Sequence, residues 1–269
     1  MNDKLAFSVT NQNFEILPVN LLLAYAKAIS PSLNNAFEKL TDAEISTSDF
    51  SFYTSVSSVY SSKIEGEDIE LDSYVKHKRF GVPFSPDYTK KTDDLYEAYL
   101  FAQQSPLAKE NIEKAHVILT RHLLAKHWQG KTRKQNMFVT SPEGQIEYVA
   151  ALPQIVEAEM GKLYADIKLL TDADLGISDV FFFASLIHLV FVKIHPFNDG
   201  NGRTARLIEK WFLAQRLGAK AWFIQSEKYY YLHQQMYYRN IRSLGIEYPY
   251  LDYDKALPFL LMLPQCMVN

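Results

Sequence analysis

Residues 195–206 read HPFNDGNGRTAR and join two segments that have the hydrophobic periodicity of helices. Pro196 limits continuation of the first helix. Gly200 and Gly202 allow a tight loop whose backbone N–H groups can converge on an anion. The amides and dipole at the start of the next helix add to the same site. The stretch therefore predicts an anion-binding turn between two helices.

Two arginines in this stretch predict which anion binds there. Arg203 and Arg206 are three residues apart, so both lie on one face of the first turns of the helix. Positive charges at this end oppose the helix dipole unless an anion lies between them. The alternative is a glycine-rich helix connection with surface arginines. We interpret the stretch as a cradle for a polyphosphate.

Two further side chains supply chemistry beside the cradle. Asp199 offers a hard oxygen ligand of the kind that Mg²⁺ uses when it bridges phosphate oxygens. His195 is the group in the stretch that can take up a proton near neutral pH. A base, a metal ligand and an anion hole together indicate phosphoryl or nucleotidyl transfer to a hydroxyl group.

The stretch also matches the pattern H-P-F-x-[D/E]-G-N-G-R-x-x-R without a gap. About nine specified positions give a chance frequency on the order of 10⁻¹¹ per start site. In this the chain resembles the Fic family, whose members mostly transfer AMP from ATP to Ser, Thr or Tyr of target proteins. Family relatives that act as kinases carry Lys at the position of Gly202, so the resemblance implies the AMP-transferring type. It also implies these roles: His195 as the base, Asp199 as the Mg²⁺ ligand, Gly200, Asn201 and Gly202 as the anion hole, Arg203 as a phosphate contact and Arg206 as the γ-phosphate ligand.

The resemblance extends to a segment upstream of this motif. Gly130-Lys131-Thr132-Arg133 precedes residues 136–149, which have the alternation and the Ser-Pro-Glu-Gly turn of a β-hairpin. This resembles the family's flap, which holds a target segment by β-strand addition. The similarity covers about residues 113–217 and implies a target protein bound through the hairpin.

A second motif lies in residues 47–66, which are predicted to form an amphipathic helix and its stop. Ser61, Glu65 and Gly66 match the family's inhibitory pattern [S/T]-x-x-x-E-[G/N]. A carboxylate at the C-terminal end of a helix costs about 0.3–1 kcal/mol against the dipole, and a buried cation would offset that cost. We expect Glu65 to pair with Arg206. The alternative is a solvent-exposed Glu65 before an ordinary helix stop.

Composition excludes several classes of protein. Lys and Arg number 28 and Asp and Glu 31, so a net charge of −3 argues against nucleic-acid and anionic-membrane partners. A single cysteine, Cys266, excludes an intramolecular disulfide framework and a Cys-based zinc site. The most apolar stretch, residues 180–192, is shorter than the roughly 20 residues that span a bilayer. The N-terminus lacks the pattern of a signal peptide, so a cytoplasmic protein is expected.

Periodicity and low Gly and Pro counts (10 and 11) predict a mostly helical body with one β-hairpin. Together with this, the resemblance implies an all-α Fic fold, a helical bundle with one β-hairpin flap. Residues 5–18 are expected to form a short strand or an extended arm. We expect an N-terminal region (1–110), a Fic core (111–217) and a C-terminal helical extension (218–269). Helices are predicted over residues 20–39 (interrupted near Pro31), 47–65, 92–103, 111–126, 153–170, 178–194, 203–217 and 227–243.

The functional hypothesis is a protein adenylyltransferase that uses ATP and Mg²⁺ and is restrained by Glu65. Two alternatives are removal of AMP by the same site and a catalytically silent nucleotide-binding or interaction module. Self-modification and a homo-oligomer are left open. His188 is interpreted as a satisfied core histidine, and the tyrosines of residues 229–238 as core packing. The pair Lys90-Lys91 is interpreted as solvated.

Overall fold

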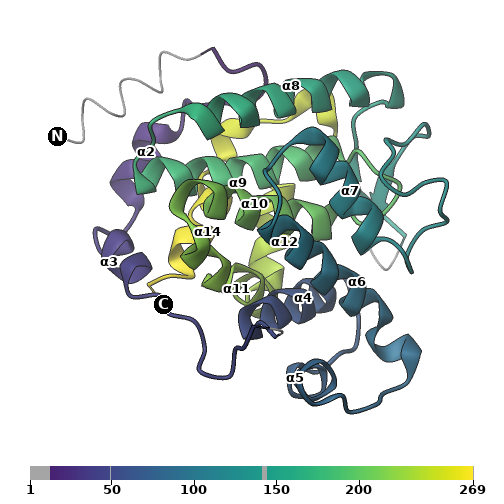
Figure 1. Cartoon of the computed structure of the whole chain (residues 1–269). Helices are drawn as coiled ribbons and strands as arrows, with labels where there is room; N and C mark the ends of the chain where they lie inside the picture. The colour runs from purple at the N-terminus through teal and green to yellow at the C-terminus, as the bar shows by residue number, and fades with distance from the viewer. Residues whose placement is uncertain (1–12, 49, 141–143, 269) are drawn as a thin grey trace.

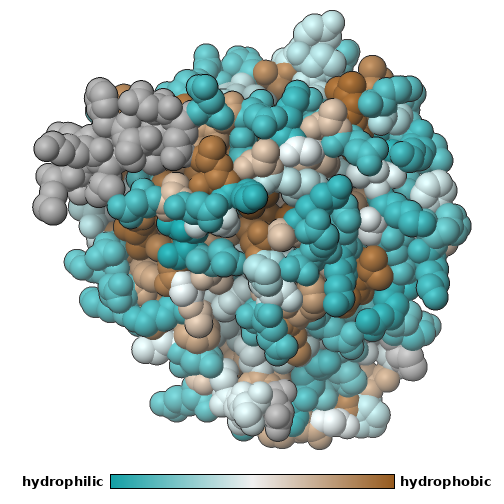
Figure 2. All heavy atoms as spheres, turned by 45° about the horizontal axis from the view of Figure 1, so that its top comes forward, coloured by the Kyte–Doolittle hydropathy of each residue, from teal (hydrophilic) through white to brown (hydrophobic). Residues whose placement is uncertain are grey.

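A computed structural model describes residues 13–48, 50–140 and 144–268. Helices α9 (Ile177–Ile194) and α10 (Asn201–Leu217) pack against each other in the middle of the molecule (Figure 1). By length and composition α9 could cross a membrane, with a mean hydropathy of 1.9, but 83% of it is buried inside the fold. Its apolar side chains form the centre of the core, and Figure 2 shows mostly hydrophilic side chains over one outer face.

The other elements surround this pair, with α8 above α9, α2 and α3 at the left, and α4, α5 and α6 below α10 in Figure 1. The remaining helices are α2 (Leu22–Ala28), α3 (Leu33–Glu38), α4 (Phe52–Ile64), α5 (Leu71–Phe80), α6 (Pro86–Gln103), α7 (Lys109–Leu119), α8 (Pro153–Asp172), α11 (Ser226–Leu232), α12 (Gln234–Arg242), α13 (Leu257–Leu260) and α14 (Met262–Gln265). The predicted mostly helical fold with one hairpin is confirmed.

The hairpin consists of β1 (Phe138–Thr140) and β2 (Ile146–Val149), paired antiparallel with Phe138 opposite Val149. Residues 141–143 of its predicted turn lie outside the described residues. On the other edge of β2, the N–H of Val149 donates to the carbonyl of Ile246 at 2.7 Å, and Val149 forms a parallel bridge with Glu247. The C-terminal extension therefore supports the hairpin from one side.

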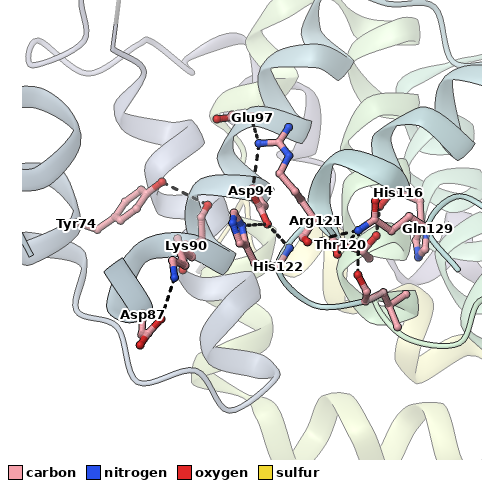
Figure 3. A network of polar contacts seen from close by, with 12 residues as sticks. Tyr74, Asp87, Lys90, Asp94, Glu97, His116, Thr120, Arg121, His122 and Gln129 are labelled. Carbon is pink, nitrogen blue, oxygen red and sulfur yellow. Dashed lines mark hydrogen bonds and ion pairs between the residues drawn. The ribbon is translucent and has the colours of Figure 1, made fainter. Parts of the chain in front are cut away.

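The predicted helix over residues 111–126 is wrong beyond α7, which ends at Leu119. Asp94 on α6 accepts hydrogen bonds from the His122 N–H at 2.9 Å and from its Nδ1 at 2.8 Å (Figure 3). A continuing helix would need that N–H for the carbonyl four residues earlier. The side-chain amide of Gln129 then donates to the carbonyls of Thr120, Arg121 and Leu124. These tertiary contacts end the helix and fix the segment that leads to the hairpin.

Two other predicted helices differ from the structure. The helix predicted over residues 227–243 is broken at His233, because α11 packs against α4 while α12 packs against α13. The helix predicted from Thr47 begins only at Phe52, because the backbones of Thr47 and Phe50 pair with each other.

Residues 5–12 of the predicted strand or extended arm lie outside the described residues. Residues 13–18 form no strand, which leaves the alternative of an extended arm. Their backbone is held by buried Asp166 on α8, which accepts the N–H groups of Glu15, Ile16 and Leu17.

Helix α4 is held in place by buried polar contacts. Lys210 on α10 donates to Ser57 on α4 at 2.6 Å and to Glu227 on α11. Tyr99 on α6 donates to the other oxygen of Glu227 at 2.6 Å. Lys210 and Glu227 are both 0% exposed. Both charges are buried, so the loss of either one would leave the other without a partner away from water. The intact pair therefore holds α4 against α10 and α11.

We expect Lys210→Met to lower the free energy of unfolding by about 3–5 kcal/mol, because it leaves Glu227 buried without a cation. Urea denaturation measures this change. Lys220→Met is the matched control, since Lys220 pairs with Glu38 on the surface, where both side chains are about half exposed. That variant should change stability by about 0.5 kcal/mol or less. Equal losses in both variants would contradict a structural role for the buried pair.

Candidate functional site

His195 occupies a strained turn at the end of α9. Its φ of 54° makes it the one non-glycine with positive φ among the described residues. Non-glycine residues in this region cost about 1 kcal/mol or more and persist where the surroundings enforce them. The following residue, Pro196, ends the helix. The imidazole of His195 is thereby turned out of the helix and borders a cavity.

Arg133 enforces this turn from outside. Its side chain is 1% exposed and donates to main-chain carbonyls at the end of α9 and at both roots of the hairpin. The acceptors are the carbonyls of His195 (2.7 Å), Gln135 (2.8 Å), Ile194 (3.3 Å) and Ala151. The Arg133 N–H also donates to Pro196 at 2.9 Å. Arg133 therefore fixes the hairpin relative to the backbone of His195.

The hydrogen bonding of His195 determines which nitrogen can act as a base. Its Nδ1 lies 3.3 Å from the carbonyl oxygen of Val192, an acceptor, so Nδ1 carries the proton. The Nε2 atom is then left as a proton acceptor. Burial, with a contribution from the charge of Arg133, lowers the pKa of His195 to about 4. The imidazole is neutral at physiological pH and can accept a proton.

The start of α10 has the close approaches of an anion site. Gly200 has φ +77°, and a Cβ there would lie 2.9 Å from Cγ2 of Thr120. A Cβ at Gly202 would lie 2.5 Å from Oε1 of Glu65. Asn201 is buried and bonds the backbone of Phe197 with its side-chain oxygen and nitrogen, both at 2.9 Å. A side chain larger than hydrogen would therefore clash at either glycine, and Asn201 closes the loop behind them.

The structure is compatible with Mg²⁺ at Asp199 if phosphate supplies further ligands. The Asp199 side chain is exposed, and its Oδ1 accepts the Gly200 N–H at 2.6 Å. Within residues 13–48, 50–140 and 144–268, no group of three His, Cys, Asp or Glu side chains could hold a metal ion. Mg²⁺ commonly binds one or two carboxylates plus substrate phosphates and water. Asp199 therefore fits a metal that arrives with a nucleotide.

Arg206 lies at the centre of a buried polar cluster. Its side chain is 1% exposed and donates to Oε1 of Glu65 at 2.7 Å. It also donates to the Ser61 hydroxyl at 2.8 Å, to the Ser61 carbonyl at 3.1 Å and to the Tyr237 hydroxyl at 3.4 Å. The structure thus brings together all three sequence-predicted residues of this contact: Ser61, Glu65 and Arg206.

The end of α4 explains why Glu65 faces Arg206. Gly66 has φ +87°, its N–H bonds the carbonyl of Lys63 at 3.0 Å, and the N–H of Glu67 bonds the carbonyl of Ser62 at 3.1 Å. These two bonds form a Schellman motif, in which a left-handed glycine ends a helix. The chain therefore reverses directly after Glu65, which leaves its carboxylate against the start of α10.

The electrostatics of Glu65 favour its charged form. Burial by itself would raise the pKa of the carboxyl, but the charges of Arg206 and Arg203 and the hydrogen bond from Arg206 outweigh it, so the pKa is lowered. The Glu65 side chain keeps 27% exposure, so solvent partly screens the pair. Glu65 is therefore charged at neutral pH and remains in contact with Arg206.

Glu65 also limits the space at the site. A cavity of about 170 Å³ is bordered by Glu65, His195, Gly202, Arg206, Tyr148 of the hairpin and Tyr238 of α12. Small-molecule sites usually measure about 300–1,000 Å³, so this cavity is smaller than such sites.

Arg203 is 3% exposed, and its Nε finds no hydrogen-bond partner among the described residues. This buried donor fits the phosphate contact predicted for Arg203.

Sequence patterns missed several residues at the site. Tyr237, predicted as core packing, is buried and also contacts Arg206, while His188 bonds Tyr237 and Glu209 as a satisfied core histidine. Lys193 lines the cavity, and burial lowers its pKa to about 8. Its position two residues before His195 could have suggested that Lys193 lies near the site. A sequence pattern cannot show that its side chain is buried.

His116 was also missed as a residue of this region. It is 0% exposed and stacks on Phe197 at 3.7 Å between ring centroids. Its Nδ1 accepts the Gly130 N–H at 2.9 Å, so its Nε2 carries the proton and donates to the Asp199 carbonyl at 3.0 Å. His116 therefore joins the start of the flap to the loop before α10, and the helix position alone gives no sign of this.

Comparisons with known proteins place the site in a family context. Residues 106–213 match the Fic/DOC family. A Fic family protein from Desulfovibrio desulfuricans G20 has a similar structure, with a TM-score of 0.72 and 18% identity over 95% of this chain and 74% of that one. A Fic domain containing signaling protein from Bacteroides thetaiotaomicron VPI-5482 has a TM-score of 0.63 and 19% identity, over 93% of this chain and 92% of that one. Fic-1 (aa134–508) from C. elegans has a TM-score of 0.62 and 16% identity, over 92% of this chain and 68% of that one. No curated protein matches the chain.

The neutral state of His116 gives a pH prediction. Burial lowers its pKa from the ordinary 6.5 to about 4. A proton on Nδ1 would also break the hydrogen bond from the Gly130 N–H. As pH falls from about 6.5 towards 4, the unfolded chain takes up a proton that the folded chain does not, so stability falls. Between pH 7 and 5 this one group should lower the free energy of unfolding by about 2 kcal/mol.

Urea denaturation of wild type and His116→Gln at both pH values tests this. Glutamine retains a hydrogen-bond donor but does not titrate, so the variant should be less stable at pH 7 and lose less stability on acidification. The same pH dependence in both proteins would contradict a buried neutral His116.

Proposed function

Because the chain carries a Fic/DOC family domain in residues 106–213, and members of that family commonly transfer AMP to proteins, we propose that this protein transfers AMP from ATP to a hydroxyl group of a target protein. The observation that carries the proposal is the shared cavity of His195, Gly202 and Arg206. It combines a neutral imidazole with a helix start and a buried guanidinium. This set suits proton abstraction beside a bound phosphate chain.

The proposal gives each residue of the site a role. Bound Mg-ATP supplies the α-phosphate as electrophile and pyrophosphate as leaving group. The Nε2 atom of His195 accepts the proton as the target hydroxyl attacks. The first amides of α10 and Arg203 stabilise phosphate charge, and Asp199 is the residue that would hold Mg²⁺. Arg206 orients the γ-phosphate, which places the α-phosphate in line with the incoming hydroxyl.

The hairpin suggests how the target is presented. The C-terminal segment near Glu247 occupies the outer edge of β2. Among the described residues, the outer edge of β1 pairs with no strand. Phe138 on β1 and Ile146 on β2 are about half exposed. We therefore assign β1 as the edge to which an extended target segment adds through main-chain hydrogen bonds.

In the same proposal the contact between Glu65 and Arg206 restrains the enzyme. Arg206 cannot bind the carboxylate and a γ-phosphate in the same geometry, since both anions need the same N–H groups. A phosphate chain bound without Arg206 would leave the α-phosphate misplaced. A displacement of about 1 Å can lower a rate about 10²-fold.

Labelled ATP tests the reaction assignment. In a cell lysate, or on the protein itself, α-labelled ATP should label protein and γ-labelled ATP should not. His195→Ala should lower α-label transfer by about 10²-fold or more with little change in ATP affinity, because it removes the base and leaves the cradle. Incorporation of γ-label, or full activity of His195→Ala, would contradict the assignment.

The restraint predicts opposite effects of two substitutions. Glu65→Gly should raise AMP transfer by about 10²-fold, because Arg206 becomes free for phosphate. Arg206→Ala should not, because it removes the phosphate ligand together with the restraint. Glu70→Gln is the matched control, since Glu70 pairs with Lys63 at 2.6 Å and its charge change leaves Arg206 untouched. Equal transfer by wild type and Glu65→Gly at saturating Mg-ATP would contradict the restraint.

A further inference from the structure

The Schellman motif at the end of α4 directs a second carboxylate towards α10. Glu67 lies two residues after Glu65, and its own N–H closes the motif on Ser62. Its Oε1 lies 3.3 Å from Nη2 of Arg203. Arg203 and Arg206 are separated by one helical turn, so two carboxylates separated by one glycine contact two arginines on one face of α10.

We propose that Glu67 is a second restraining carboxylate, which competes with nucleotide phosphate for Arg203 as Glu65 does for Arg206. The inference rests on the proposed nucleotide site. It adds a residue outside the inhibitory pattern of Ser61, Glu65 and Gly66. The ligand displaced by Glu67 is the phosphate chain of the nucleotide, and the nucleoside part is unaffected.

A third charge sets the strength of this contact. The same Oε1 of Glu67 accepts a hydrogen bond from Lys91 on α6 at 2.7 Å, shorter than its 3.3 Å contact with Arg203. Lys91, interpreted from the sequence as solvated, is 40% exposed and lies beside Glu67, which is 27% exposed. Lys91 and Arg203 therefore compete for one oxygen. Lys91 weakens the hold of Glu67 on Arg203.

The two restraints differ in kind. Glu65 meets an arginine that is 1% exposed, at 2.7 Å, inside a buried cluster. Glu67 meets Arg203, whose Nε has no hydrogen-bond partner among the described residues, through one longer contact that it shares with Lys91. Both carboxylates are 27% exposed, so salt screens both pairs, and the difference lies in the length and the sharing of the contact. Glu67 is therefore the weaker restraint, and its effect should shrink as ionic strength rises.

Isothermal titration of the full chain with ATP at low ionic strength tests the proposal without a target protein. Glu67→Gln should bind ATP about two- to fivefold more tightly than wild type. Glutamine retains the backbone N–H of the motif. Glu70→Gln, which removes the same charge from the partner of Lys63, should not show this gain. Adenosine, which lacks phosphate, should bind Glu67→Gln and wild type equally.

A substitution at Lys91 should have the opposite sign. Lys91→Met leaves Glu67 to Arg203 alone and should weaken ATP binding by about twofold or more. Lys90→Met is its control, because Lys90 loses the same charge but pairs with Asp87 (Figure 3). Weaker ATP binding in Lys91→Met than in Lys90→Met supports the competition. Equal affinities in these two variants would overturn it.

Glu65→Gly separates failure of this inference from failure of the proposed function. If Glu65→Gly gains ATP affinity and Glu67→Gln behaves as Glu70→Gln does, the second restraint is wrong and the nucleotide site stands. If neither wild type nor Glu65→Gly binds ATP, the proposed function fails and this inference fails with it. In the double variant Glu65→Gly/Glu67→Gln, ATP should bind more tightly than in Glu65→Gly.

Discussion

The guanidinium of Arg206 is a charge held almost completely out of water, and the arrangement around it follows from that constraint. Removing a guanidinium from water costs several kcal/mol unless anions and acceptors replace the lost hydration. Ser61 and Glu65 from α4 and Tyr237 from α12 supply them. The Arg206 side chain on α10 therefore has its hydrogen-bond partners only when α4 and α12, which are far apart in the sequence, both pack against α10. The same need for an anion makes the position suitable for a phosphate, so the stability of the fold and the proposed restraint of the site would have one physical origin.

A second constraint is the backbone turn at His195. A left-handed non-glycine residue needs support from outside the turn, and the Arg133 side chain provides it from the segment before the hairpin. His116 on α7 holds the next part of the loop through the carbonyl of Asp199. The hairpin, the base and the start of α10 are therefore connected through hydrogen bonds from buried side chains to the main chain. Tyr148 of the hairpin borders the same cavity as His195 and Glu65.

The sequence predicted those parts of the site that depend on local chemistry. Gly200, Gly202 and the arginines after them form a turn and a helix start, and Gly66 ends α4, so patterns of a few residues suffice. The roles of Arg133, His116 and Glu67 depend on what lies opposite them in the fold, which no local pattern contains. The same reason explains the incorrect helix ends: Asp94 on α6 captures the N–H of His122, and the segment 227–243 divides at His233 because its halves pack on different helices.

In the proposed mechanism Arg206 binds either Glu65 or a γ-phosphate. Isothermal titration of wild type and Glu65→Gly with ATP and with AMP tests this exchange. AMP lacks the γ-phosphate, so we expect the substitution to strengthen ATP binding by at least about tenfold and to change AMP binding far less, since a hydrogen bond to a charged group contributes about 1.5–3 kcal/mol. An equal gain for ATP and AMP, or no gain for ATP, would contradict it.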